Sequence, residues 1–304
     1  MIPALQKDDE LVAEFHEADA VTGVIHVWWL GQSGFLIKWN GEGLLFDPYL
    51  SDSLTRKYDG TEQPHVRMSE QAVDPLLLSG VDVVTSSHNH TDHLDAETLL
   101  PLKAANPNLK LVVPEANLEF AERRLGPAGP ELVGVDVGSY VEVGGFQINA
   151  ITAAHNEIEY DSEGRSKFLG YVVTCGQFAI FHSGDTLWHD SLVKEVRRWP
   201  INLALLPING NDPARKVAGN LNGFEAAALA KAISASLVIP CHYHMFEFNT
   251  ADPDEEFIGC CERLNQRYRI LEIGQCMTMG PVPDSSAGDA RATEKQEDDW
   301  GLGY

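Results

Sequence analysis

Basic residues are scarce in this sequence. It contains 22 lysines and arginines against 45 aspartates and glutamates in 304 residues, which gives a formal net charge of −23 at pH 7. Binding to nucleic-acid phosphates or to anionic lipid needs a basic surface. The composition therefore argues against nucleic acid as a partner. A small anionic substrate stays compatible with it, because a few local cations and bound metal ions can reverse the field inside a cleft.

Long hydrophobic runs are also missing. No stretch approaches the roughly 18 consecutive apolar residues of a membrane span. The N-terminal sequence MIPALQKDDELVAEF lacks the apolar run of a secretory signal peptide. We therefore expect a cytoplasmic protein with no membrane span.

Cysteine is rare, and its spacing matches no disulfide or zinc framework. The count of five is odd, there is no C-x-x-C, and two of the five are neighbours that are poorly placed to bridge each other. We expect reduced thiols that pack as small core residues rather than act as nucleophiles or ligands. They are Cys175, Cys241, Cys260, Cys261 and Cys276.

The hydrophobic patterning that is present indicates one mixed α/β domain over residues 23–280. Glycine and Asn-Gly turn signals separate the first strand-like runs, as in hairpins. Strand-like and helix-like segments then alternate to a final strand at 268–274, which favours two packed sheets with helices outside. Residues 1–22 are predicted to hold a short helix. Residues 281–304 are polar and acidic, so we predict a disordered tail.

The sharpest local feature is SSHNHTDHLD at 86–95, which follows a buried-type strand. Three imidazoles and one carboxylate in this loop suit a divalent ion such as zinc, manganese or iron. A polar loop with surface histidines is the alternative, and this density of ligand-type residues makes it the weaker interpretation. The candidate ligands are His88, His90, Asp92 and His93.

Three more candidates, His155, Asp185 and His242, come after strand-like runs elsewhere in the chain. Taken singly, each has an ordinary explanation, since a histidine at a strand end is often only a hydrogen-bond partner and Gly-Asp-Thr is a common turn. Together they repeat the placement of His88. We therefore predict that these strand ends meet at one edge and that seven side chains surround a metal site.

This set, His-x-His-x-Asp-His followed by a distant histidine, aspartate and histidine, resembles the metallo-β-lactamase fold superfamily. Within it, WLGQSGFLI at 29–37, FDPYLSDS at 46–53, HSGDT at 182–186 and VIPCHYHMF at 238–246 resemble the L-ascorbate-6-phosphate lactonase family. The resemblance implies an α/β (α+β) fold, a four-layer αββα sandwich with metal ions at one edge of the sheets.

The resemblance also implies how the ligands are shared between two ions. Manganese is the metal that the lactonase family suggests, zinc is the alternative, and iron would fit the same donors. Asn89 stands where flavodiiron-type relatives have a glutamate, which disfavours reduction of oxygen or nitric oxide. The implied sharing is His88, His90 and His155 on the first ion, Asp92, His93 and His242 on the second, and Asp185 with a hydroxide on both.

Two divalent ions about 3.5–4 Å apart lower the pKa of a bridging water and polarise the bond under attack. The sequence therefore predicts a metal-dependent hydrolase that needs no serine or cysteine nucleophile. Asp92 and Asp185 are the candidate catalytic carboxylates. Asp92 is a ligand that could also pass a proton to the leaving oxygen.

Substrate contacts are predicted from two segments that follow strands. In NGNDPARK at 209–216, the fork of Arg215 suits a phosphate or carboxylate, although a solvated loop cation is an equal alternative. His244 would point away from His242 on an extended chain and could reach the substrate from a loop. The candidates are Asn209, Asn211, Arg215 and His244.

The preferred function is a lactonase acting on a small anionic, sugar-phosphate-like lactone. A phosphodiesterase or phospholipase-D-like hydrolase is the alternative, because related families on this fold cleave phosphodiesters. A non-catalytic regulatory protein is disfavoured, since degenerate relatives lose ligands and all seven are present here. The resemblance also suggests a homo-oligomer.

Overall fold

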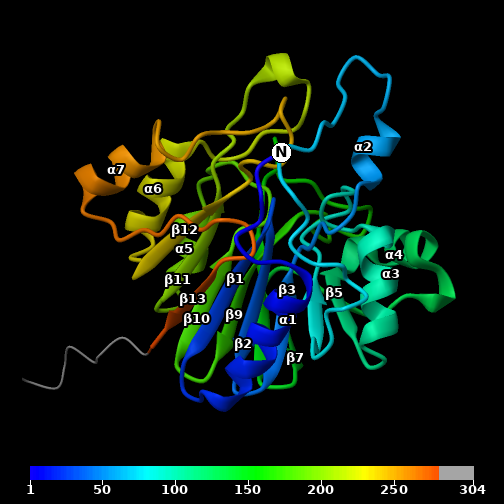
Figure 1. The fold of residues 1–304 in the computed structure, drawn as a ribbon. Coiled ribbons are helices and arrows are strands. Elements are labelled where there is room, and N and C mark those ends of the chain that lie inside the picture. The colour runs from blue at the N-terminus through cyan, green and yellow to red at the C-terminus, as the bar shows by residue number, and fades with distance from the viewer. Residues whose placement is uncertain (281–304) are drawn as a thin grey trace, which may run out of the picture.

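Two mixed β-sheets pack face to face in the part of the chain that this computed structural model describes, residues 1–280 (Figure 1). The predicted sandwich with outer helices is confirmed. In the described residues, the larger sheet has the order β13 (Cys276–Met279), β1 (Ile25–Gly31), β2 (Gly34–Trp39), β3 (Glu42–Phe46), β4 (Val83–Thr85), β5 (Lys110–Pro114) and β6 (Glu131–Val135). The smaller sheet has the order β12 (Leu237–Cys241), β11 (Leu203–Pro207), β10 (Phe178–His182), β9 (Leu169–Cys175), β8 (Phe146–Thr152) and β7 (Tyr140–Val143).

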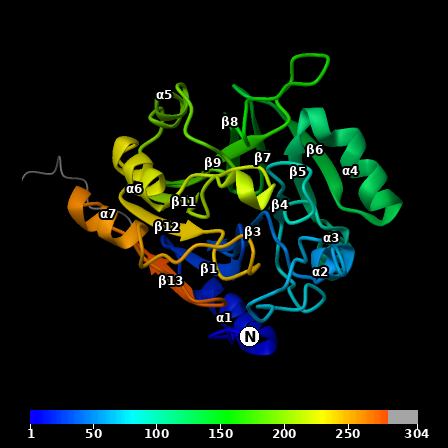
Figure 2. The same ribbon diagram turned by 90° about the horizontal axis from the view of Figure 1, so that it is seen from above.

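Helices flank both sheets, which gives the sandwich its outer layers (Figures 1 and 2). α1 packs beside β1, where Trp28 Nε1 donates to Glu14 Oε2 at 2.7 Å. α3 and α4 lie on the same side, near β4 and β5, while α6 and α7 lie beside β12. The helices are α1 (Asp8–Glu17), α2 (Ser53–Lys57), α3 (Ala96–Ala105), α4 (Leu118–Leu125), α5 (Leu192–Val196), α6 (Gly223–Ala232) and α7 (Phe257–Leu264).

Strand direction determines which loops can meet. β10, β11 and β12 are parallel, and β8 shares their direction because β9 is antiparallel to both β8 and β10. The carboxyl ends of these four strands therefore reach one edge of the smaller sheet. The loop after β4 reaches the same edge, since Leu169 N, at the start of β9, donates to Ser87 O at 3.0 Å.

Local sequence features account for the turns and caps that hold these elements. β2 and β3 pair at Trp39 and Glu42, so Asn40 and Gly41 form a two-residue loop with φ values of 47° and 86°. Positive φ at both positions is the type I′ geometry for which Asn-Gly is favoured. Asn222 is the N-cap of α6, and Glu225 completes a capping box.

The predicted final strand at 268–274 is wrong. Residues 268–274 form no strand, and β13 begins only at Cys276. Gly274 has φ 77° and donates its N–H to Trp29 O at 2.7 Å, and a Cβ there would lie 2.0 Å from Gln6 O. This turn has to be completed before the chain can pair with β1. β6 was not predicted, because its partly exposed sequence has no clear alternation.

The remaining boundary predictions are not decided by this fold. Leu11 and Phe15 of α1 are buried in the main hydrophobic core, yet the division between residues 1–22 and 23–280 stays a prediction. The predicted tail, 281–304, lies outside the described residues. No helix in residues 1–280 is long and apolar enough to cross a membrane.

Candidate metal centre

The loop after β4 carries the four clustered ligand candidates and is held at both ends. Ser86 N donates to Val112 O at 2.9 Å, and Tyr171 Oη donates to Ser86 O at 2.9 Å, so the loop begins between the two sheets. At its far end, Asp95 caps α3 by accepting from Glu97 N. The intervening residues therefore project at the edge of the sandwich.

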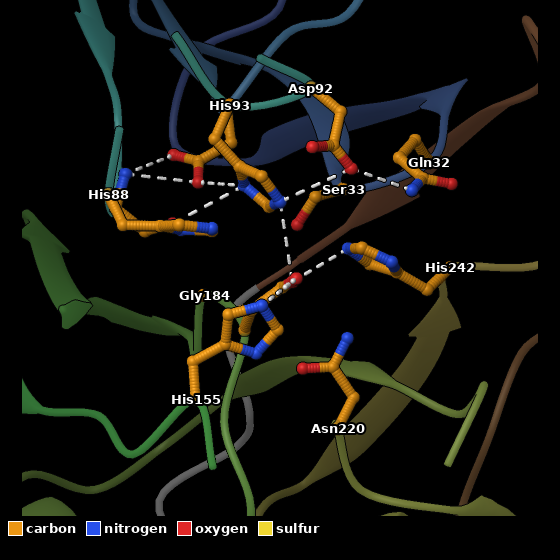
Figure 3. Close-up of polar contacts among 12 residues, drawn as sticks. Gln32, Ser33, His88, Asp92, His93, His155, Gly184, Asn220 and His242 are labelled. Atoms are coloured by element: carbon orange, nitrogen blue, oxygen red, sulfur yellow. Dashed lines mark hydrogen bonds and ion pairs between the residues drawn. The ribbon is translucent and has the colours of Figure 1, made fainter. Parts of the chain in front are cut away.

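His155, Asp185 and His242 follow β8, β10 and β12, and the structure brings all three to this loop. Figure 3 shows His155 and His242 near His88 and His93. His242 Nε2 lies 2.8 Å from Asp185 Oδ1, and His93 Nε2 lies 3.4 Å from the same oxygen. His155 Nε2 lies 3.6 Å from Asp185 Oδ2. The two carboxylate oxygens of Asp185 thus face different histidines.

The ligand atoms of these residues fall into small groups. Within each group, all the ligand atoms lie within 4.8 Å of one another. Two groups have the same membership as the ligand sets expected for two ions, and a third includes Asp185. The groups are His88, His90 and His155; Asp92, His93 and His242; and His88, His93 and Asp185.

Atoms of this cluster are buried without hydrogen-bond partners among the described residues. A buried polar atom without a partner is costly, and a shared divalent cation would satisfy several of them at once. Imidazole nitrogens with carboxylate oxygens are the donors that zinc, manganese and iron accept. The donor set therefore fits a metal. The atoms are His88 Nε2, His93 Nε2, His242 Nδ1 and Nε2, and Asp185 Oδ1; the last faces His93 Nε2 and His242 Nε2 in ion-pair contacts that do not meet the geometry of a hydrogen bond.

The opposite ring nitrogen of three histidines has a fixed partner. A hydrogen bond at Nδ1 sets the tautomer and leaves Nε2 free to face a cation, as in most protein metal sites. The imidazoles are therefore oriented before any ion binds. The pairs are His93 Nδ1 with Asp47 Oδ2 at 2.7 Å, His88 Nδ1 with Ser87 Oγ at 3.0 Å, and His155 Nδ1 with Gly219 O at 3.0 Å.

Asp47 is a fully buried carboxylate behind His93. It also accepts from Thr85 Oγ1 at 2.8 Å and from Ser87 N at 3.0 Å. Burial opposes its charge, but the hydrogen bond from His93 and the neighbouring histidines outweigh this and lower the pKa of Asp47 to about 2. Asp47 is therefore a permanent anion that fixes His93.

The histidines of this cluster differ in the direction of their pKa shifts. Burial, reinforced by His93, lowers the pKa of His88 well below its ordinary value, so this imidazole is neutral. Burial opposes a charge on His93 as well, but Asp185 and Asp92 raise the pKa of His93 well above its ordinary value. The proton held among His93 and the carboxylates would have to leave for these residues to hold a cation.

Gln32 joins Asp92 to His242. Its Nε2 donates to Asp92 Oδ2 at 2.9 Å (Figure 3). Its backbone oxygen accepts from His242 N at 3.0 Å. The link brings a residue after β1 into contact with two different ligand-bearing loops. Gln32 bonds to Oδ2 of Asp92, so the other carboxylate oxygen, Oδ1, is not held by Gln32.

The cluster opens into a cavity of about 360 Å³, which is within the size range of small-molecule sites. Lys57, Arg124 and Lys216 line it, whereas its lining carboxylates are Asp92 and Asp185. Three cations against two carboxylates make this lining slightly cationic, in contrast to the strongly acidic chain, although Lys216 Nζ also lies 3.7 Å from Glu62 Oε2.

The four predicted substrate contacts lie beside this cavity and do not line it. Asn209 Nδ2 and Arg215 Nη1 donate to Asn249 Oδ1 at 3.0 and 2.9 Å, and Asn249 lines the cavity. In this structure Asn209 and Arg215 therefore contact Asn249, which is itself part of the cavity lining. As substrate contacts, Asn209, Asn211, Arg215 and His244 all stay predictions.

Sequence reasoning missed the supporting residues. Asp47 follows β3 in the way that His88 follows β4, so the strand-end criterion applied to every strand would have found it. Gln32 has the same placement at the end of β1. Lys57 and Arg124 carry no such signal, because each lies on a helix far from the ligands in sequence.

Two stacked sheets with outer helices, and histidines and aspartates gathered at their common edge, define the metallo-β-lactamase fold. The chain belongs to the β-lactamase superfamily, because the family described as "Beta-lactamase superfamily domain" matches residues 26–242. That span contains all seven predicted ligands.

Relatives and solved structures agree with this assignment. A UPF0173 metal-dependent hydrolase of Methanopyrus kandleri is 28% identical over 83% of this chain and 98% of its own length. A possible metal-dependent hydrolase from Veillonella parvula has a similar structure, with TM-score 0.66, 16% identity and coverage of 85% of this chain and 99% of that one. The metallo-β-lactamase fold protein YhfI of Bacillus subtilis gives TM-score 0.61 at 18% identity, over 84% and 100% of the two chains.

Proposed function

We propose that the protein is a metal-dependent hydrolase with two divalent ions, manganese or zinc, at the strand-end cluster. Relatives named metal-dependent hydrolases support hydrolysis as the reaction class. The proposed ligands are His88, His90 and His155 for one ion, Asp92, His93 and His242 for the other, and Asp185 for both.

The position of Asp185 carries this proposal. Its Oδ1 faces His93 and His242, which belong to one ligand set, while its Oδ2 faces His155, which belongs to the other. A carboxylate with one oxygen towards each set is placed to bridge two cations. Burial opposes its charge, but His242 and His93 hold the pKa of Asp185 well below its ordinary value, so it is ionised.

Two divalent ions bound here would lower the pKa of a water molecule and polarise the bond under attack. The chain's own residues have separate tasks. Gln32 and Asp47 hold Asp92 and His93 in place by the hydrogen bonds described above. Asp92 Oδ1, which does not bond to Gln32, is the oxygen that would take a proton from the attacking water and pass it to the leaving oxygen.

The proposed substrate is a small anionic lactone of the sugar-phosphate kind. The three cations that line the cavity support an anion, since cationic walls concentrate anionic ligands even on an acidic protein. The resemblance of the sequence to ascorbate-6-phosphate lactonases supports a lactone. Cytoplasmic location and self-assembly stay predictions from the sequence.

A substrate panel tests the proposed reaction. The purified protein, supplied with manganese or with zinc, is offered carboxylate- and phosphate-bearing lactones and, in parallel, bis(p-nitrophenyl) phosphate. Ring opening, followed as acid release, is the expected result. Cleavage of the phosphodiester alone would replace the lactonase proposal by the phosphodiesterase alternative. A metal-loaded protein that is inactive on both classes would contradict the proposed lactonase reaction.

A further inference from the structure

Four rings form a wall of the cavity beside the metal centre. The ring of His65 stacks on Tyr58 with centroids 4.1 Å apart and an angle of 17°. Phe248 and Phe246 meet the His65 ring edge-on, at 4.5 and 5.1 Å. We call this set the aromatic wall, and its members are Tyr58, His65, Phe246 and Phe248, all of which line the cavity.

The aromatic wall is built from two segments that are far apart in the sequence and bound to each other. Met68 N donates to Met245 O at 2.8 Å, and Glu247 N donates to Val66 O at 3.1 Å. Asn249, which anchors the second segment, accepts from Asn209 and Arg215. The wall is therefore preformed, which reduces the entropy lost when a ligand binds.

These rings are not part of the main hydrophobic core. Phe246 belongs to a separate small cluster with Tyr49, Leu54 and Met245, against which Tyr58 and Phe248 pack. Tyr58, His65 and Phe248 stay only partly buried, so apolar surface faces the cavity. Surface of this kind gains free energy when a ligand covers it.

The aromatic wall is uncharged, in contrast to the cations of the same cavity. His65 Nδ1 lies 3.1 Å from Gln63 O, which places the ring proton on Nδ1. Burial lowers the pKa of His65, so the ring is neutral near pH 7. Lys57 Nζ lies 5.1 Å from the centre of the Tyr58 ring, so a positive charge adjoins the apolar surface.

We propose that the aromatic wall is a substrate subsite that takes an apolar or planar ring, so that the substrate is a ring-bearing anion. This rests on the proposed function only in placing the reacting bond at the metal centre. The anionic group would lie by the lysines and Arg124, and the ring against Tyr58, His65 and Phe248. Specificity would then depend on the ring as well as on the charge.

A pair of probes with equal charge tests the subsite without turnover. Benzylphosphonate and methylphosphonate carry the same head group, so any contact with metal ions or lysines is common to both. Calorimetry on the manganese-supplied protein should show at least about tenfold tighter binding of benzylphosphonate, since burying a ring stabilises a complex by that much or more. Equal affinity for the two probes would overturn the proposal.

Substitutions in the aromatic wall test whether it is the source of the preference for benzylphosphonate. Phe248→Ala and Tyr58→Ala should each reduce the ratio of the two affinities by about threefold or more. Phe224→Ala is the matched control, because Phe224 is 56% exposed on α6 and does not line the cavity. A preference that survives in both wall variants, or is lost equally in the control, would place the ring elsewhere and contradict the subsite.

The two proposals fail in different ways. If lactones are hydrolysed but the phosphonates bind equally, the subsite is wrong and the hydrolase stands. If benzylphosphonate is preferred through Phe248 and Tyr58 but no lactone is opened, the subsite stands and the lactonase reaction is wrong.

Discussion

At the scale of single residues, the metal centre depends on side chains that are not ligands. Asp47 is buried behind His93, and its charge is maintained by a hydrogen-bonded environment that lowers its pKa to about 2. Such a partner orients the imidazole and increases its basicity, and its loss typically weakens metal binding by about 10–100-fold.

Asp47→Asn should therefore weaken metal affinity by about tenfold or more, because the amide keeps the size of the carboxylate and loses its charge. Competition with a chelator measures the dissociation constant. Asp9→Asn, at an exposed position on α1, is the matched control and should leave metal affinity unchanged. Equal affinities in the two variants would show that Asp47 has only a packing role.

That the ligand candidates gather at one edge could be predicted from sequence, because all seven lie in loops that follow buried strands. Arg215 shows where that reasoning stops. Its fork suits an anion, yet in the fold Nη1 bonds to Asn249 Oδ1 and the side chain does not line the cavity. Which loop cation faces the site depends on loop packing, and strand patterning carries no information about it.

At the scale of elements, α4 supports the loop that carries four ligand candidates. Arg124 Nη1 donates to Asn89 O at 2.9 Å and to Leu94 O at 3.0 Å, so one guanidinium spans both ends of that loop. The guanidinium carbon of Arg124 also lies over the Phe120 ring, 4.4 Å from its centroid. The helix thus fixes the loop without contributing a ligand.

Arg124→Ala should lower the free energy of unfolding by about 1–3 kcal/mol, since two carbonyls lose a charged donor. It should also weaken metal binding, because the loop is less well ordered. The preceding residue offers a control: Arg123 is mostly exposed, and its one ion pair among residues 1–280 is with Glu119 on the same helix, at 3.5 Å. Arg123→Ala should cost less than about 0.5 kcal/mol in denaturant unfolding. Equal losses of unfolding free energy in both variants would contradict the proposed role of Arg124 in holding the loop.

Elements that local sequence features specify could be predicted, whereas elements that depend on tertiary contacts could not. The Asn40-Gly41 hairpin and the capped α6 follow from local chemistry. β13 begins after a turn at Gly274 that only the packing against Gln6 and Trp29 explains. The aromatic wall likewise joins residues 58–68 to 245–249, a pairing that no local pattern indicates.

At the scale of the whole molecule, charge is distributed unevenly. The chain carries a formal net charge of −23, yet three cations line the cavity at the metal centre. Long-range repulsion of an anionic substrate by the acidic surface is screened by salt, because the Debye length is about 8 Å at physiological ionic strength. Attraction by a lysine at the cavity acts at short range and is screened less.

Lys57→Glu should lower kcat/KM for a carboxylate-bearing lactone by about threefold or more, and affect a neutral lactone much less. The ratio of the two kcat/KM values is the measurement, since it cancels general losses of activity. Lys194→Glu makes the same change of charge at an exposed position on α5 and should leave the ratio unchanged. An equal change of the ratio in both variants would mean that net charge, and not the cavity, attracts the anion.

The central claim is that seven side chains hold two divalent ions and that Asp185 bridges them. Elemental mass spectrometry of the purified protein after loading with manganese or zinc tests it most directly, with Asp185→Asn beside the wild type. The account predicts about two ions per chain in the wild type and a clear loss, to about one or fewer, in a variant that keeps its fold by circular dichroism. Two ions retained in Asp185→Asn, or a wild-type protein that takes up none, would contradict it.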